Sequence, residues 1–186
     1  MKLILHVCCA PCSIQCIQAL AEEGIGPELL WYNPNINPYT EYCSRRDALK
    51  AFAESRALPL IEPRSTLITE NNNKTSCSSV SSVVKNCASC YRLRLEKTAR
   101  LAAIGGFDAF SSTLLISPYQ NHELIKKIGE ELAAEHGLEF LYRDFRGRFR
   151  EGQRQARQAG YYMQKYCGCI HSQEESLMSQ ARRGRK

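Results

Sequence analysis

The sequence lacks the features that define several common classes of protein. It contains no run of about 18 apolar residues, so we expect no membrane-spanning helix. Its opening stretch, MKLILHVCC, has one lysine and an apolar run too short for a signal peptide, which favours a cytoplasmic protein. It has no internal repeat, no glycine-rich phosphate loop and no Ser–His–Asp order, which argues against solenoids, P-loop nucleotide binding and triad hydrolysis.

The composition is that of a folded globular chain. Its 186 residues suit one domain, and 44% of them are hydrophobic and 24% charged. We expect a single α/β domain over residues 1–175, which includes a polar loop or lid at 65–86 that is rich in Asn, Ser and Thr. Residues 176–186 are expected to form a basic, disordered tail.

Short apolar runs alternate with amphipathic segments along the chain. Strands are predicted at 3–7, 28–33, 58–63, 107–115 and 138–142, and helices at 13–24, 41–56, 91–105, 118–134 and 153–159. Ser13 and Ser117 are the expected N-caps of the first and fourth of these helices. The alternation predicts an α/β fold with a parallel sheet of about five strands and helices on both faces. Ligands of such sheets bind beyond the carboxyl ends of the strands, where the most informative residues of this chain gather.

Cysteine is what the sequence has in excess, with ten residues. A reducing cytosol does not preserve most disulfides, so closely spaced thiols indicate a metal site or redox chemistry. Seven of the ten form three clusters, which are Cys8, Cys9 and Cys12, then Cys87 and Cys90, then Cys167 and Cys169.

The thiol clusters allow more than one kind of centre. Two C-x-x-C pairs can form a tetrathiolate zinc site, but more than 70 residues separate Cys12 from Cys87. Four thiolates can also hold a 4Fe–4S cube. The adjacent side chains of Cys8 and Cys9, which we expect to diverge, suit such a wide cluster better than one zinc ion. Seven thiols exceed one four-coordinate site, so a second metal or a redox-active disulfide pair is expected beside the cluster.

Other cysteines and histidines near these clusters fit packing roles. Cys16, Cys43 and Cys77 are interpreted as small buried side chains. His6 belongs to the first predicted strand and is expected to be a packed core histidine rather than a ligand. His171 is a weaker ligand candidate than His6.

Positive charge gathers in the second half of the chain. The formal net charge is +6, from 25 Lys and Arg against 19 Asp and Glu. Six arginines and only two acids lie between Arg143 and Arg157, and the stretch RRGRK at 182–186 adds four cations. Such density suits a phosphate backbone, while the plainer interpretation is a solvated surface with a frayed tail.

Six motifs in order resemble one known family. HVCCAPC, YNPNINPYTEY, CASCYRLRLEKTA, GFDAFSSTLLISPYQN, DFRGR and YCGC occur in the order typical of the QueH-type epoxyqueuosine reductases, over residues from about 4 to 172. The resemblance implies a Rossmann-like fold related to the adenine nucleotide alpha hydrolases. It also implies the reductive deoxygenation of epoxyqueuosine to queuosine at the tRNA wobble position, with a 4Fe–4S cluster and an adjacent iron, without cobalamin.

The resemblance further implies a role for each clustered thiol. It implies that the cluster ligands are Cys8, Cys9, Cys87 and Cys90. It implies that the catalytic residues, which hold the adjacent iron (or another divalent metal) or form a redox pair, are Cys12, Cys167 and Cys169. Cys9 and Cys12 could exchange these roles, since some members of the family carry aspartate at the position of Cys12. An oxygen ligand there fits an iron with open coordination.

Substrate contacts are implied in the same way. The arginines that would hold phosphates of the anticodon loop are Arg143, Arg146, Arg148 and Arg150. The tyrosines that would stack on the base are Tyr39, Tyr91 and Tyr119. The electrons would come from a donor that the sequence does not identify. This chain departs from the family at Asn86 and Met163, where arginine is common, and the departures leave the seven thiols untouched.

Two other functions are compatible with the motifs. One is a zinc-stabilised RNA-binding module without catalysis, which would use the two C-x-x-C pairs and the basic segment and would leave YCGC idle. The other is a thiol–disulfide oxidoreductase that uses a C-x-x-C motif.

Overall fold

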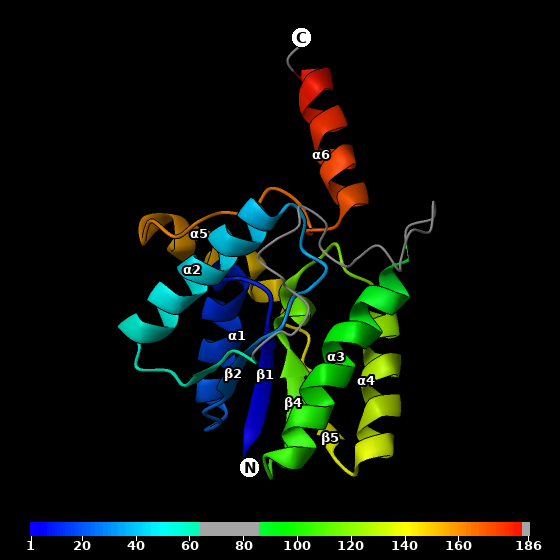
Figure 1. Ribbon diagram of the computed structural model, residues 1–186. Coiled ribbons are helices and arrows are strands. Elements are labelled where there is room, and N and C mark those ends of the chain that lie inside the picture. The colour runs from blue at the N-terminus through cyan, green and yellow to red at the C-terminus, as the bar shows by residue number, and fades with distance from the viewer. Residues whose placement is uncertain (64–85, 184–186) are drawn as a thin grey trace.

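The computed structural model describes residues 1–63 and 86–183, and in these ranges the chain forms a five-stranded parallel sheet of order β3-β2-β1-β4-β5 (Figure 1). The strands are β1 (Leu3–Val7), β2 (Glu28–Trp31), β3 (Leu60–Ile61), β4 (Ala109–Ser112) and β5 (Glu139–Phe140). The helices are α1 (Ala10–Glu22), α2 (Tyr39–Ser55), α3 (Cys87–Ile104), α4 (His122–His136), α5 (Phe149–Gln158) and α6 (Ile170–Arg183), with short 3-10 helices η2 (Thr113–Ile116) and η3 (Arg146–Arg148). Cys77 and nearly all of the expected loop at 65–86 lie outside the described residues.

Helices cover both faces of the sheet, as Figure 1 shows. α3 and α4 pack together on one face, and α1 lies on the other with α2 and α5 beside it. The central strand β1 is buried along its whole length, which is what a strand covered on both faces requires. The predicted α/β class and parallel sheet of about five strands are confirmed.

The strand order reverses at β1, which pairs with β2 on one side and β4 on the other. Crossovers run from β1 toward β3 and then back across to β4 and β5, so the loops after β1 and β4 separate at the carboxyl edge. Such a switch point leaves a crevice at that edge of the sheet. The cysteine-rich turn after β1 lies at this crevice.

Two helix starts differ from the sequence prediction. α1 begins at Ala10 with Cys9 as its N-cap, and the hydroxyl of Ser13 donates back to the carbonyl of Cys9 at 2.8 Å, so Ser13 is inside the helix. α4 begins after Asn121, whose side chain accepts from the Leu124 amide at 3.0 Å, while Ser117 lies in the turn before it. Asn121 is thus a better-placed cap than Ser117, whereas α1 starts at Cys9 without a side-chain cap and with Pro11 in its first turn.

α3 also starts earlier than predicted, which matters for its thiols. Asn86 accepts a hydrogen bond from the Ser89 amide at 3.1 Å and caps the helix. The first turn therefore carries Cys87 and Cys90, which are three residues apart and lie on one side of the helix.

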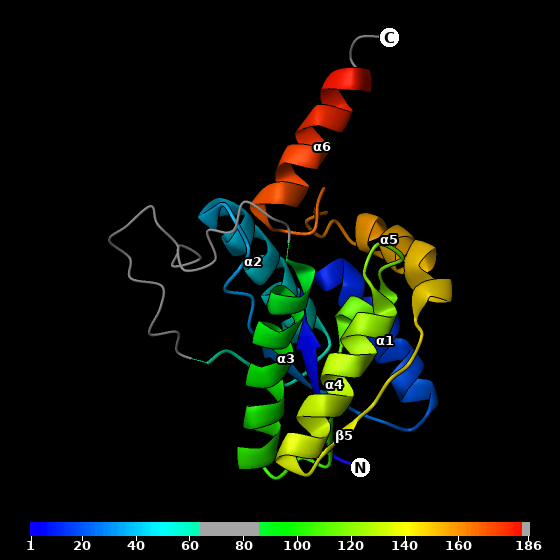
Figure 2. The same ribbon diagram turned by 90° about the vertical axis from the view of Figure 1, so that its right-hand side faces the viewer.

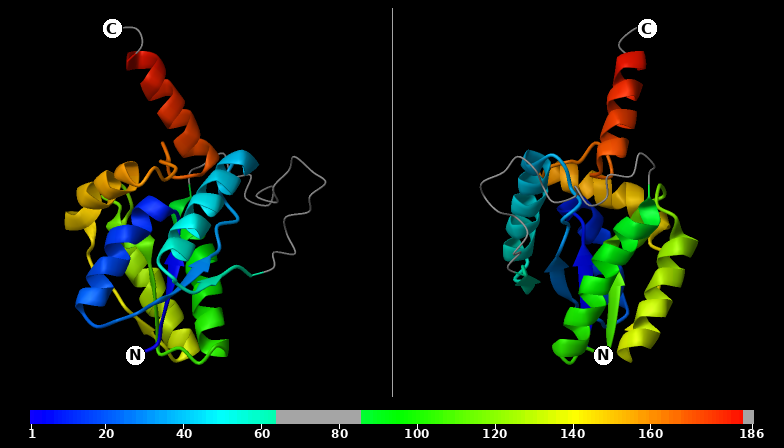
Figure 3. Two further views of the ribbon diagram at one scale, coloured as in Figure 1. Left: turned by 90° about the vertical axis from the view of Figure 1, so that its left-hand side faces the viewer. Right: turned by 45° about the vertical axis from the view of Figure 1, so that its right-hand side comes forward.

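The C-terminal segment is the largest departure from prediction. Residues 176–183, expected to be disordered, belong to α6, which projects away from the sheet in Figures 1, 2 and 3. The first turn of α6 carries no acidic residue, and Arg182 lies in its last turn, where a cation complements the helix dipole. Counting cations in the tail could not reveal this order. No helix in the described ranges is long and apolar enough to cross a membrane.

Candidate metal and active site

Three thiols converge where β1 turns into α1. The Sγ atoms of Cys8, Cys9 and Cys12 all lie within 4.8 Å of one another, and all three residues are buried. Cys8 Sγ and Cys9 Sγ are 3.8 Å apart, so our expectation that these neighbours diverge is wrong. The chain passes from strand to helix at this point and turns both side chains to the same side.

Polar groups from distant segments donate to this thiol triad (Cys8, Cys9, Cys12). The Thr113 hydroxyl donates to Cys8 Sγ at 3.4 Å, and Gln164 Nε2 lies 2.9 Å from Cys9 Sγ and 3.5 Å from Cys12 Sγ. Donors at sulfur stabilise thiolates, which are the metal-binding form. No sequence pattern pointed to Gln164, because a glutamine near YCGC resembles any surface glutamine.

The triad shares its protons unequally. Hydrogen bonds from Cys12 and then Cys9 hold the pKa of the Cys8 thiol well below its usual value. The pKa of Cys12 is raised by its hydrogen bonds to Cys8 and Cys9, and that of Cys9 is raised by burial. The arrangement thus favours the thiolate form at Cys8 over Cys9 and Cys12.

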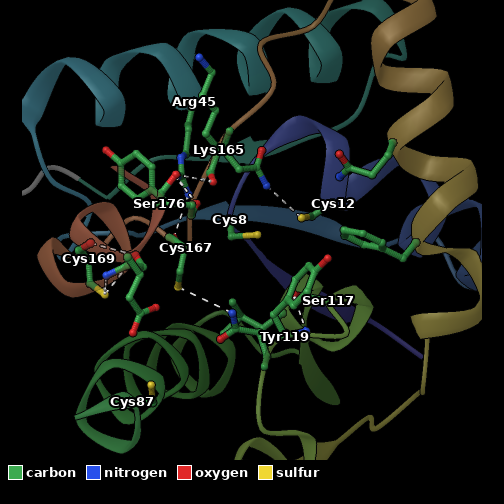
Figure 4. Close-up of a pocket in the computed structure, with 18 of the residues that line it drawn as sticks. Cys8, Cys12, Arg45, Cys87, Ser117, Tyr119, Lys165, Cys167, Cys169 and Ser176 are labelled. Carbon is green, nitrogen blue, oxygen red and sulfur yellow. Dashed lines mark hydrogen bonds between the residues drawn. The ribbon is translucent and has the colours of Figure 1, made fainter. Parts of the chain in front are cut away.

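The triad opens into a cavity of about 670 Å³, shown in Figure 4. Cys8, Cys12 and Cys167 reach into it from different segments, and Cys87 lies on its α3 side. Further lining side chains come from helices and loops around the carboxyl edge and include Arg45, Tyr91, Arg94, Ser117, Tyr119, Gln120, Phe149, Gln153, Gln164, Lys165, Tyr166, Cys169, Ser172 and Ser176. Five of the seven predicted thiols therefore line one cavity. Cys9 does not line it, but its sulfur lies within 4.8 Å of the sulfurs of Cys8 and Cys12, which do. Cys90 is half-buried one turn farther along α3 and does not line it.

The loop that carries Cys167 and Cys169 is held by a buried arginine of α2. Arg45 is 2% exposed and donates to the carbonyls of Tyr166 at 2.9 Å and Cys167 at 3.0 Å. Its guanidinium carbon lies 5.5 Å from the centre of the Tyr166 ring, and Glu41 Oε1 accepts from its Nε at 2.7 Å. Glu41 also accepts from the Tyr162 hydroxyl. One paired guanidinium thus fixes two consecutive carbonyls of the loop.

Backbone geometry shapes the same loop. Gly168 has a φ of +118°, which side chains rarely adopt, and a Cβ there would lie 3.1 Å from Ile36 Cγ1 and 3.3 Å from an Arg45 nitrogen. The carbonyl of Gly168 accepts from the Asn37 amide at 2.7 Å, and the Tyr166 hydroxyl donates to the Asn37 carbonyl at 2.7 Å. A glycine between the two cysteines is therefore required by space and conformation.

The polar segment after β2 serves as scaffold for this edge. Asn33 Nδ2 donates to the Val7 carbonyl at 2.8 Å, directly before the triad. Asn35 Oδ1 accepts from Arg94 Nε at 2.8 Å, and Asn37 holds the Cys167–Cys169 loop as described. Alternate asparagines of YNPNINP thus contact three different parts of the site.

The two thiols of YCGC have different environments. Cys169 precedes α6, and its sulfur accepts from the Ser172 amide at 3.4 Å. A hydrogen bond from Cys167, supported by Ser172, lowers the pKa of Cys169 to about 4. The same interaction raises the pKa of Cys167, whose sulfur lies 3.7 Å from Gln120 Nε2. A helix N-terminus is a favourable place for a thiolate.

Buried positive charge faces the thiols. Arg94 is 3% exposed and lines the cavity, and it forms no salt bridge with a carboxylate in the described ranges. An isolated buried cation is unfavourable unless a negative group offsets it. Thiolates bound to metal would supply that charge, so the donor set and its surroundings fit a thiolate-held metal centre.

The candidate stacking tyrosines occupy three different positions. Tyr119 lines the cavity and is 83% exposed, with its ring centre 6.1 Å from that of Phe149. Tyr91 also lines the cavity but is 4% exposed, and its hydroxyl donates to Gln120 at 2.8 Å. Tyr39 stacks on Tyr42 and does not line the cavity.

The candidate phosphate-binding arginines lie outside the cavity lining. Three of them form salt bridges, which are Arg143 with Glu23, Arg146 with Asp144 and Arg148 with Glu22. Arg150, on α5, is exposed and forms no salt bridge with a carboxylate in the part of the chain that the structure describes.

Of the residues expected to be buried, the structure describes Cys16, Cys43 and His6, and it fully buries Cys16 and His6. Cys16 is fully buried, and Cys43 is half-buried on α2. His6 is also fully buried, with Nδ1 2.9 Å from the Ser112 hydroxyl and Nε2 3.2 Å from the Tyr32 carbonyl. Burial lowers the pKa of His6 to about 4, so it is a neutral core histidine, as predicted. His171 is half-buried on α6 and does not line the cavity.

Comparison with known proteins gives matches over nearly the whole chain. A family model described as Epoxyqueuosine reductase QueH matches residues 3–175. A protein of that name from Dehalococcoides mccartyi is 36% identical over 174 residues, covering 94% of this chain and 93% of the relative. The same name is carried by a Thermotoga maritima protein that is 34% identical over 194 residues, covering 98% and 96%. It is also carried by an Acinetobacter baylyi protein that is 35% identical over 190 residues, covering 97% and 86%.

Proposed function

The chain belongs to the family of QueH-type epoxyqueuosine reductases, and from this premise we propose that it converts epoxyqueuosine in tRNA to queuosine at the wobble position. It is thus an oxidoreductase of tRNA modification. The observation that carries the proposal is the thiol triad, which opens into the cavity that Cys87, Cys167 and Cys169 also line. The zinc-stabilised RNA-binding alternative gives the last two thiols no task.

The metal centre that we propose uses all seven clustered thiols. The proposed cluster ligands are Cys8, Cys9, Cys87 and Cys90, and the proposed ligands of an adjacent iron, or members of a redox pair, are Cys12, Cys167 and Cys169. When bound, such a centre supplies electrons one at a time and a Lewis acid. The triad, the shared cavity and the buried cations Arg45 and Arg94 support this assignment.

The reaction sets the electron balance that the site has to meet. Both carbon–oxygen bonds of the epoxide break, a carbon–carbon double bond forms, and two electrons and two protons are consumed as water leaves. A pair of thiols that becomes a disulfide releases two electrons and two protons, which is the same balance. Cys167 and Cys169 are the pair for which this role is proposed, with an electron donor of unidentified chemistry restoring them.

The cavity provides room for the modified nucleoside. Its volume of about 670 Å³ is within the range of small-molecule pockets. Bases in single-stranded loops are recognised unstacked and held against aromatic rings, and Tyr119 is the exposed candidate at this cavity. Tyr91 would shape the wall, because its hydroxyl is already committed to Gln120. Tyr39 stays a candidate for stacking outside the cavity.

Phosphate contacts by the arginines stay a prediction. Arg150 can contact a phosphate without losing a carboxylate partner in the described ranges. Arg143, Arg146 and Arg148 would each exchange a surface salt bridge for a phosphate, which costs little.

Metal analysis with a turnover assay tests the proposal. Protein purified without oxygen should be brown and hold about four to five irons, and with a chemical reductant it should convert epoxyqueuosine-containing tRNA. Cys167→Ser should remove turnover while the fold is kept, and Cys43→Ser, outside the cavity, is the matched control. A colourless protein that holds only zinc and converts no tRNA would falsify the proposal.

A further inference from the structure

We propose that α5 carries an RNA-binding track at the rim of the cavity, in which Arg150, Arg154 and Arg157 contact backbone phosphates and Tyr119, braced by Phe149, stacks on a base. We call the three arginines the arginine row. The inference rests on the proposed function for its partner, an RNA. It assigns the electrostatic contact mainly to residues that the motifs did not indicate.

One face of α5 is fixed against α1. Gly152 and Ala156 are buried, and a Cβ on Gly152 would lie 3.1 Å from the Pro11 carbonyl oxygen. Gln15 of α1 donates to the Gln155 side chain at 3.0 Å. This close packing sets the rotation of α5 about its axis, and so determines which of its residues face outward.

The neighbouring face of α5 lines the cavity through Phe149 and Gln153. The arginine row follows at positions i, i+4 and i+7, which places its members on one side of the helix. Each residue turns the helix by about 100°, so Arg157 lies about 40° from Gln153 and Arg150 about 100° from Phe149. The row therefore runs directly beside the face that lines the cavity.

The charges of the row are available to a ligand. Arg150 and Arg157 are exposed and form no salt bridge with any carboxylate that the structure describes. Within the described residues, Arg154 forms one salt bridge, with Glu151 of the same helix, and also donates to Gln158 at 3.1 Å. The side chains of Arg154 and Glu151 are both exposed, and such a surface pair is easily exchanged. Arg143 and Arg148 differ, because they bridge to Glu23 and Glu22 at the C-terminal end of α1 and tie separate segments together.

The exposed ring at the rim gives the row a second binding element. Tyr119 is 83% exposed although it lines the cavity, and its edge-to-face contact with Phe149 joins it to α5. Proteins that bind single-stranded nucleic acid combine a cationic groove with aromatic rings on which bases stack. An acidic protein partner would use the arginines but would have no need of an exposed ring beside a nucleoside-sized cavity.

The salt dependence of tRNA binding tests the track. Each phosphate contact contributes to the slope of log affinity against log salt concentration. Arg150→Ala and Arg157→Ala should each make that slope shallower by about 0.7, and the double variant should bind tRNA about tenfold more weakly at low salt. Tyr119→Ala should weaken binding about tenfold with the slope unchanged, because its contribution is stacking.

Arg100→Ala is the matched control. Arg100 is exposed and, within the described residues, forms no salt bridge, but it lies in the last turns of α3, at the far end from Cys87. Its removal should leave the slope and the affinity unchanged. Circular dichroism of each variant checks that the fold is kept.

The outcomes separate this inference from the proposed function. If wild-type protein converts the tRNA but the row variants keep the wild-type slope, the track is wrong and the proposed function stands. If the row variants lose slope while wild-type protein converts nothing, the track stands and the proposed function is wrong. Binding of polyglutamate as tight as that of tRNA, and equally sensitive to the row, would overturn the RNA assignment.

Discussion

Two thiol-bearing regions meet at the cavity, and they are built in different ways. Cys8, Cys9 and Cys12 lie in the turn after β1 and the first turn of α1, and local geometry brings their sulfurs within 4.8 Å of one another. Cys167 and Cys169 lie on a loop that is held by Arg45, more than 120 residues earlier in the sequence. The triad is thus positioned by its own segment, and the loop by tertiary contacts. The two regions should respond differently to substitution.

The largest effect is expected at the triad. Cys8→Ser should remove the proposed metal centre and lower turnover by more than about 100-fold, because under the proposed function it removes a metal ligand rather than an outer contact. Iron content and the visible spectrum of the anaerobic protein measure this. Cys16→Ala, which changes a fully buried thiol of α1 one turn after Cys12, should keep its iron and cost about 1 kcal/mol in unfolding free energy. Equal iron loss in both variants would show that the triad has no special role.

Substitution of Arg45 should disturb the Cys167–Cys169 loop and leave the triad intact. Arg45→Lys keeps the charge but cannot bind two carbonyls and Glu41 together, so turnover should fall about 10- to 100-fold while bound iron changes little. Arg45→Met should in addition cost about 3–5 kcal/mol, because it leaves Glu41 buried without its partner. The half-buried neighbour Arg46, changed to Lys, is the control. Parallel loss of iron and turnover in Arg45→Lys would contradict the separation.

Gly168→Ala should disturb the same loop more mildly. A positive φ and the contacts to Ile36 and Arg45 predict a cost of about 1–3 kcal/mol, with turnover reduced. Gly24→Ala is a matched variant, since Gly24 has a φ of +75° but no atom within 4 Å of the added Cβ. Urea unfolding of both variants separates the free-energy cost of crowding against Ile36 and Arg45 from the cost of the positive φ. A Gly24 variant that is as inactive as the Gly168 variant would show that the close contacts at position 168 do not matter for turnover.

The mildest test leaves the sequence unchanged and compares thiol reactivity in metal-free protein. With a pKa of about 4, Cys169 is a thiolate at pH 6, and it is only half-buried, so iodoacetamide should label it before the buried triad. Lowering the pH from 6 toward 4 protonates Cys169 and should slow its labelling. Peptide mass spectrometry reads the order. If Cys9 or Cys12, whose pKa values are raised, were labelled before Cys169, the predicted order of thiol reactivity would be wrong.

What could be predicted from the sequence follows the same division. The thiols after β1 were recognisable because a buried strand followed by HVCCAPC places them at the carboxyl edge, whatever the rest of the chain does. The parallel sheet was predictable from the alternation of strands and helices. Arg45, Glu41 and Gln164 were not, because their roles come from contacts between segments that the sequence keeps far apart. The helical order of α6 was masked by a composition that also suits a frayed tail.

The arginine-rich segment illustrates the limit most clearly. Its charge was visible in the sequence, but which arginines are paired was not. Arg143 and Arg148 bind Glu23 and Glu22 at the C-terminal end of α1. These carboxylates come near only because α5 and the segment before it pack against α1. Arg150 and Arg157 face away from α1, because the buried Gly152 and Ala156 fix the rotation of α5.

The sequence by itself determined the parallel α/β frame, the thiol-rich turn and the family, since these depend on local pattern and on motifs in order. The tertiary structure alone decided that Cys167 shares a cavity with the triad, that a buried arginine holds its loop, and that one row of arginines borders the rim. The physical reason is that patterns of residues set which elements form and which face each buries. Buried charge pairs, carbonyl contacts and helix rotation arise only when elements distant in sequence pack together.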